Sequence, residues 1–305
     1  VAVESKLAGF DIGLKAAQDG TKPGKQGTDT LYNAAPDAFI SAIAEFPAAP
    51  RGIIGHGIAR LIDYQNDAYA RTYLERLKPI AAADSDESKK LTGEVARHLA
   101  RWMSFEDVIR VADLKTRPDR LPRIRSDLKA GPDEPVVVID FLKPGLEEFC
   151  SIMPGFIARP LIGWATRNNK LDSFNFGLHV TTSGVFGYSM MRFLAKLKGI
   201  RRIGHRYASE QALIERWLLS VKGALNLDRH TGMEVIACAR LVKGYGETHR
   251  RGSSNLARIL GELIEPALAG SPTALADQVS KARNSALADS SCAELDSTMA
   301  TLITK

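Results

Sequence analysis

Apolar residues recur three and four positions apart along most of this chain, the spacing that places side chains on one face of an α-helix. The longest such stretch covers residues 91–114, where one stripe contains Val95, Leu99, Trp102, Phe105, Ile109 and Ala112. Further stretches predict helices over residues 1–19, 36–45, 58–77, 157–167, 188–197, 207–221, 272–287 and 293–303. The pattern predicts a mainly α, multi-helix domain with Trp102 and Trp217 buried in one core.

Two segments have the character of strands. The run PVVVIDFL at residues 135–142 is rich in β-branched residues and bounded by prolines, which favours a strand. Residues 174–185 mix turn residues with β-formers and can hold a second one. We therefore expect a minor β component of one or two short strands.

Prolines predict two interruptions of the helical pattern. Pro79 is expected to end the helix at 58–77, because proline lacks the N–H that a helix interior needs. The segment KTRPDRLPRIR at residues 115–125 alternates bases with two prolines, so we expect a basic connector rather than a regular helix. Such a connector can hold phosphate or an acidic partner surface, although a merely solubilising role is favoured.

A polar stretch near the N-terminus indicates how the chain is divided. Residues 20–31 (GTKPGKQGTDTL) are rich in Gly, Lys and Thr and can bury little, which is typical of a linker. We expect a terminal helix at residues 1–20, a linker at 21–50 and a mainly helical domain at 51–305. Because residue 1 is Val and a helical pattern is already under way there, we expect a fragment of a longer chain or a processed subunit.

Composition narrows the class of protein. Of the 305 residues, 45% are hydrophobic, which is ordinary for a globular domain, and no apolar run approaches the length of a membrane span. The formal net charge is +6 with acids interspersed among the bases, which allows nucleic acid binding without implying it. Three widely spaced cysteines without a C-x-x-C pair indicate a reducing cytoplasm and no metal site.

The candidate site lies in residues 240–260, where a polar segment with three glycines separates two apolar helical faces. Its candidate binding residues are Lys243, Tyr245, Glu247, His249, Arg250 and Arg251. This stretch can bind an anion or a partner, or it can be a helix–helix corner whose charges pair within the chain, and the second interpretation is favoured. The expected internal acids are Glu247 or the Glu106–Asp107 pair. The expected external partners are coenzyme A phosphates or an acidic subunit surface.

The densest basic cluster is elsewhere, at residues 196–206 (KLKGIRRIGHR). Aromatic residues, which stack on bases in single-strand binding surfaces, are scarce in it. We therefore consider nucleic acid an unlikely partner. Complete motifs of known catalytic sites are missing as well: Gly244 and Gly246 begin a G-x-G-x-x-G pattern, but His249 stands in place of its third glycine.

Four blocks of the sequence together suggest a family: residues 60–77 (RLIDYQNDAYARTYLERL), 97–125, 141–154 (FLKPGLEEFCSIMP) and 240–252 (RLVKGYGETHRRG). In this order they resemble the C-terminal domain of unknown function in fused indolepyruvate ferredoxin oxidoreductases, of the 2-oxoacid:ferredoxin oxidoreductase family. The similarity covers roughly residues 55–260. Residues 1–20 resemble the last helix of the preceding pyruvate-oxidoreductase-type domain.

The resemblance implies oxidative decarboxylation of an aryl 2-oxoacid to an acyl-coenzyme A, with thiamine diphosphate and iron–sulfur clusters as cofactors of the whole enzyme. Because this sequence has no thiamine-binding motif and no cluster-binding cysteine set, we expect no cofactor in this segment and no activity from it alone. Its expected role is structural, in contact with other domains or subunits of the oxidoreductase. Two alternatives stay open, a stand-alone anion-binding enzyme and a basic nucleic-acid-binding module.

Overall fold

The fold is mainly helical with one two-stranded antiparallel sheet, which confirms the predicted fold class. The computed structural model describes residues 35–303 except 87, 132, 152, 169, 171–176, 245, 271–273 and 290. The predicted helix at residues 1–20 and the linker as far as residue 34 therefore lie outside the described residues.

The α-helices in this range are α3 (Ile40–Ala44), α4 (Ala48–Tyr64), α5 (Asp67–Ala83), α6 (Lys90–Met103), α7 (Val108–Lys115), α8 (Arg120–Leu128), α9 (Leu146–Ser151), α10 (Gly155–Arg167), α11 (Val185–Lys196), α12 (His205–Leu227), α13 (Arg229–Ala237), α14 (Gly246–Ile259), α15 (Glu265–Ala269), α16 (Leu275–Ala288) and α17 (Ala293–Ile303). The remaining elements are the 3₁₀-helices η1 (Asp37–Phe39), η2 (Leu197–Ile203) and η3 (Cys238–Leu241), the short π-helix η4 (Leu260–Ile264), and the strands β1 (Ile139–Leu142) and β2 (Leu178–Thr181).

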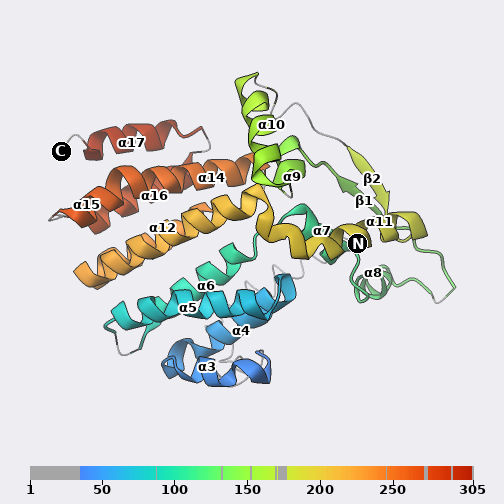
Figure 1. Cartoon of the computed structure of the whole chain (residues 1–305), viewed down its shortest axis with the longest axis horizontal. Helices are drawn as coiled ribbons and strands as arrows, with labels where there is room; N and C mark the ends of the chain where they lie inside the picture. The colour runs from blue at the N-terminus through green and yellow to red at the C-terminus, as the bar shows by residue number, and fades with distance from the viewer. Residues whose placement is uncertain are drawn as a thin grey trace, which may run out of the picture.

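Most helices stack in layers, from α3 and α4 through α5, α6 and α12 to α14, α16 and α17 (Figure 1). The elements α7 to α11, with the sheet, gather at one end of this stack (Figure 1). One large apolar cluster fills the stack, whereas the sheet end has a separate cluster of only four buried residues, Ala112, Val180, Met191 and Ala195. The two parts therefore differ greatly in how much apolar surface they bury.

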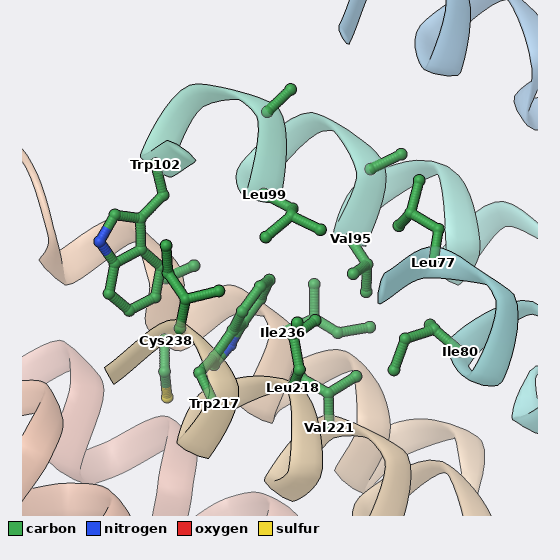
Figure 2. Packing of buried hydrophobic residues seen from close by; sticks show 14 of the residues in the cluster. Leu77, Ile80, Val95, Leu99, Trp102, Trp217, Leu218, Val221, Ile236 and Cys238 are labelled. Atoms are coloured by element: carbon green, nitrogen blue, oxygen red, sulfur yellow. The ribbon is translucent and has the colours of Figure 1, made fainter. Parts of the chain in front are cut away.

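The main core is built around two tryptophans, as the sequence predicts. The rings of Trp102 on α6 and Trp217 on α12 lie 5.7 Å apart, centroid to centroid, and both are buried (Figure 2). The Trp217 indole N–H donates a hydrogen bond to the Val235 carbonyl over 3.1 Å, so its polar atom is satisfied inside the core. Leu99, Leu218 and other aliphatic side chains surround the pair (Figure 2).

The helix predicted over residues 58–77 is wrong in its boundaries. The helix is interrupted at Gln65. The Asn66 side chain then accepts a hydrogen bond from the Tyr69 N–H, which caps a new helix. Pro79 does not end that helix, which continues to Ala83. Burial of Leu77 and Ile80 on either side of the proline holds the helix in place despite the missing N–H.

The helix predicted over residues 91–114 is likewise two helices. α6 ends at Met103, and the Asp107 carboxylate starts α7 by accepting a hydrogen bond of 2.7 Å from the Arg110 N–H. The apolar stripe continues across the break because Phe105 and Ile109 are also buried. Periodicity alone hides this break, whereas the Ser104 and Asp107 side chains indicate it.

The basic segment at residues 115–125 is partly helical, contrary to the prediction. α8 begins at Arg120 and places Pro122 in its first turn, where a missing N–H costs no helical hydrogen bond. None of the α8 residues is buried. The helix therefore covers no core of the described chain.

The strand prediction is correct in place and too long. Only the second half of residues 135–142 pairs, as β1, and it runs antiparallel to β2 with Asp140 opposite Val180 and Phe141 opposite His179. The predicted second strand at 174–185 contains β2. One face of the sheet covers the four-residue cluster, and the other leaves Ile139 and Phe141 exposed.

Candidate functional site

The candidate site forms the junction between η3 and α14. Gly244 and Gly246 have φ of +73° and +57°, a left-handed conformation that side chains with a Cβ disfavour. α14 begins at Gly246, so Glu247, His249, Arg250 and Arg251 lie in its first turns and not in an extended loop. The two glycines therefore turn the backbone sharply between η3 and α14.

A third glycine brings the two elements into contact. A Cβ at Gly252 would lie 2.1 Å from the carbonyl oxygen of Leu241, far inside van der Waals distance. α14 therefore packs directly on the backbone at the end of η3. This contact fixes the position of His249, which lies one turn earlier on α14.

His249 meets a buried carboxylate, Glu210 of α12. The His249 Nε2 lies 2.9 Å from Glu210 Oε1. The Trp102 indole N–H donates a 2.7 Å hydrogen bond to Glu210 Oε2, and the Arg206 Nε lies 3.5 Å from Oε1. Glu210 is only 5% exposed, and each of its two carboxylate oxygens faces a side chain of the same protein.

These neighbours determine the ionisation of Glu210. Burial by itself would raise the pKa of this carboxyl, because a charged group loses hydration in the protein interior. The His249 ring, the Trp102 N–H and the Arg206 guanidinium outweigh burial and leave the pKa of Glu210 below its ordinary value. Glu210 is therefore a charged, paired group at neutral pH and not a protonated acid.

The predicted site residues do not all converge. His249 and Arg250 line a cavity of about 270 Å³ between α9, α10, α12 and the start of α14. Lys243 is exposed and, with His249, lines a second cavity of about 480 Å³ on the side of α6 and η3. Glu247 is exposed, Arg251 is half-buried and Tyr245 lies outside the described residues.

The expected acids are not the ones that meet His249. Neither Glu247 nor the Glu106–Asp107 pair contacts it; the acid is Glu210, which the sequence prediction missed. A signal was present, because Glu210 continues the apolar stripe of Ile214, Trp217 and Val221 on α12 at helical spacing. A carboxylate on a buried helix face needs an internal partner.

Asp107 serves a different network. Its carboxylate and the Arg201 guanidinium form a two-point contact of 2.6 and 3.2 Å, and both side chains are only 3% exposed. Arg201 also donates hydrogen bonds to the Tyr64 carbonyl and the Gln65 side chain, each 2.7 Å, and stacks on the Tyr64 ring. One base of the dense basic cluster at residues 196–206 is therefore a buried structural residue.

The cysteines do not form a ligand set. Cys150 and Cys238 are fully buried, and burial raises the pKa of Cys238 to about 12, which disfavours the thiolate that binds metals. In the part of the chain that the structure describes, which includes all three cysteines, no group of three or more His, Cys, Asp or Glu side chains is placed to hold a metal ion. These residues do not fit an iron–sulfur cluster.

Comparison with known proteins gives one family match. Residues 50–262 match DUF6537, a family of unknown function. No curated protein and no solved structure matches the chain. Within the described residues, every helix is too short or too polar to cross a membrane.

Proposed function

This chain belongs to DUF6537, a family of unknown function, and from that premise we propose that it is a non-catalytic, partner-contacting part of an indolepyruvate-type 2-oxoacid:ferredoxin oxidoreductase. The reaction and the enzyme come from the resemblance of the four sequence blocks. Under this proposal thiamine diphosphate and the iron–sulfur clusters belong to other parts of the enzyme, which carry out the decarboxylation and the electron transfer.

The observation that carries the non-catalytic role is the pairing of His249 with Glu210. Glu210 is in contact with Arg206 and Trp102 as well, so this buried carboxylate is held by side chains of its own chain. Breaking such a buried pair is costly, typically about 3–5 kcal/mol, which is the behaviour of a structural joint. The lowered pKa of Glu210 is therefore explained by contacts within the chain and requires no substrate.

The partner-contacting role is supported by the exposed apolar side chains. Most of the large apolar residues that are exposed lie between Leu114 and Ile203, among them Phe141, Phe156, Phe186 and Phe193. Monomeric proteins rarely expose so many aromatic side chains in one part of the chain. A surface of this kind is stabilised when another domain or subunit covers it.

The test is an anaerobic assay with indolepyruvate, coenzyme A, thiamine diphosphate and an electron acceptor. The chain alone should show no turnover, and it should bind the remainder of the oxidoreductase and raise its activity or its melting temperature. Lys281→Ala, at an exposed position of α16 outside the candidate site, should behave like the parent in both measurements. Turnover by the isolated chain, or an oxidoreductase remainder that neither binds nor responds to it, would contradict the proposal.

A second candidate function is binding of a small anion in the 270 Å³ cavity. His205, Arg206 and Arg250 line this cavity, and the buried Ser253 hydroxyl has no hydrogen-bond partner among the described atoms. Glu148 and Glu210 line it too, so the cavity has little excess positive charge and this candidate ranks second. Coenzyme A or phosphate should raise the melting temperature of the parent but not of Ser253→Val if the cavity is a binding site.

A further inference from the structure

A groove separates α8 from α11 beside the sheet. It encloses about 430 Å³, and its apolar lining includes Leu121 and Ile124 of α8, Val138 next to β1, and Val185 and Tyr188 of α11. Lys115, Arg117 and Arg120 line it as well. A groove lined by apolar residues and bases can receive an amphipathic segment of another protein.

Within the described residues, the helix that forms one wall, α8, has no buried residue. Leu121, Ile124 and Leu128 are spaced i, i+3 and i+7, so they form one apolar stripe on α8. Leu128 is 64% exposed, and none of the α8 residues is buried. On the opposite wall Val185 is 86% exposed. A short helix with an uncovered apolar stripe gains stability only when something packs on that stripe.

Bases outnumber acids around the groove. Residues 115–130 contain six Lys and Arg (Lys115, Arg117, Arg120, Arg123, Arg125 and Lys129) against two Asp (Asp119 and Asp127). From outside this segment Asp140 approaches Lys115 at 2.6 Å and Arg120 at 2.9 Å, so one carboxylate serves two bases. Asp63 and Asp113 lie against Arg117. After these contacts are counted, six bases face five carboxylates, so the excess is one positive charge. The bases Lys115, Arg117 and Arg120 line the groove itself, and no acid is among its described lining residues.

We propose that this groove binds a protein segment that is apolar on one face and acidic on the others. Leucine-type side chains of the segment would cover Leu121, Ile124 and Val185, and its carboxylates would face the lining bases Lys115, Arg117 and Arg120. A second copy of this chain is disfavoured as the occupant, because its own groove would bring the same excess of bases. Nucleic acid is disfavoured because Tyr188 is the only aromatic among the described lining residues.

The polar groups inside the groove support an apolar occupant. The Thr182 hydroxyl donates to Asp140 over 2.6 Å and accepts from Arg120 over 3.0 Å. The Ser183 hydroxyl accepts a 3.0 Å hydrogen bond from the Val138 N–H. Since these groups already have partners in the chain, the attraction toward an occupant comes from apolar contact and from net charge. This inference rests on the proposed function only for the source of the segment, another part of the oxidoreductase.

The experiment uses the chain and two designed 18-residue helical peptides with the same leucine stripe, one with glutamates and one with lysines on the other faces. Binding is measured by fluorescence anisotropy at low and at high salt. The glutamate peptide should bind more tightly than the lysine peptide and should weaken as salt rises. Leu121→Asp and Val185→Asp, both at exposed positions, should each weaken its binding at least about tenfold, or about 1.4 kcal/mol.

The matched control is Leu219→Asp, because Leu219 is 70% exposed but lies on α12, outside the groove. It should bind the glutamate peptide like the parent, and circular dichroism should show that all three variants are folded. No binding of the glutamate peptide, equal binding of both peptides, or equal binding by all three variants would overturn the inference.

Two further outcomes would assign the groove to a different ligand. Tighter binding of single-stranded oligonucleotide than of the glutamate peptide would make the groove a nucleic-acid site. A dimer in sedimentation that Leu121→Asp dissociates would make it an interface between copies. Because the peptide assay needs no part of the oxidoreductase, its failure leaves the proposed function standing, whereas a chain that binds the peptide but not the oxidoreductase remainder would overturn the proposed function alone.

Discussion

At the scale of single residues, this protein places charges inside its core and satisfies them there. Arg201 and Asp107 are buried and bonded to each other, and Glu210 is buried among His249, Arg206 and Trp102. Removing one member of such a set leaves the other charged and without hydration. The basic residues of the sequence are therefore not equivalent, and two adjacent bases can contribute very differently to the free energy of unfolding.

Arg201 and Arg202 provide a direct comparison, because the first is 3% exposed and the second is exposed. Arg201→Met keeps the aliphatic stem but leaves Asp107 unpaired, and we expect a loss of about 3–5 kcal/mol in the free energy of unfolding. Arg202→Met should change it by less than about 0.5 kcal/mol. Urea unfolding followed by circular dichroism measures both. Similar small losses would show that the Asp107–Arg201 contact does not stabilise the fold.

Asp140 predicts how stability depends on pH. Burial favours a raised pKa, but hydrogen bonds from Lys115, Thr182 and Arg120 lower the pKa of Asp140 below its ordinary value. The folded protein therefore holds the charged form more strongly than the unfolded chain does. The resulting stabilisation is fully present above the unfolded pKa of about 3.9 and is lost as the pH falls through the lower folded pKa.

Asp140→Asn removes this stabilisation, so the variant should be less stable than the parent at neutral pH. The difference in unfolding free energy between the two should shrink as the pH falls below about 4. Urea unfolding at a series of pH values measures the difference. A difference that stays constant down to pH values near 2 would show that the Asp140 carboxylate is not charge-stabilised in the fold.

At the scale of elements, the sequence predicts which segments are helical better than where each helix ends. Apolar periodicity runs through the breaks at Gln65 and Ser104, because the residues after each break still face the same core. The capping side chains Asn66 and Asp107 set the true boundaries by local hydrogen bonds. At the candidate site, sequence reasoning finds the glycine reversal but not Glu210, whose contact with His249 joins helices far apart in the chain.

The contact of α14 with η3 yields a prediction for Gly252. Gly252→Ala places a Cβ against the Leu241 carbonyl, where only 2.1 Å is available, so the two elements must move apart. We expect a loss of about 1–3 kcal/mol or more in the free energy of unfolding. Thermal unfolding should show a clear drop in melting temperature.

Gly163 in α10 is the matched control, because a Cβ added there would meet nothing within 4 Å in the described chain beyond its own helix backbone. Alanine also favours helices over glycine, so Gly163→Ala should be neutral or should stabilise by up to about 1 kcal/mol. If Gly252→Ala is as stable as Gly163→Ala, the close approach of α14 to Leu241 is not a constraint on the fold.

At the scale of the whole molecule, the described chain consists of two unequal parts. The layered helices share one continuous core, whereas the end with α7 to α11 and the sheet (Figure 1) has a separate cluster of only four buried residues. The same end also has many exposed aromatic side chains. The hydrogen bonds from Arg201 to the Tyr64 carbonyl and the Gln65 side chain at the end of α4, and the α9 and α10 contacts with α12, tie the second part to the first. Helical periodicity does not reveal this division, because helices of both parts have apolar stripes. Only the structure shows which of these stripes are covered by other elements.

Unequal burial predicts unequal protection from hydrogen exchange. Local opening requires less free energy where few apolar contacts are broken, so amides of α8, α10 and α11 should exchange at least about tenfold faster than those of α4, α6 and α12. Val180→Ala, which reduces the small cluster, should speed exchange further in α11 and β2 and leave α6 unchanged. Hydrogen exchange read by mass spectrometry resolves these segments. Equal protection in both parts would show a single cooperative unit, and the exposed apolar end would then be stable without the partner that we propose.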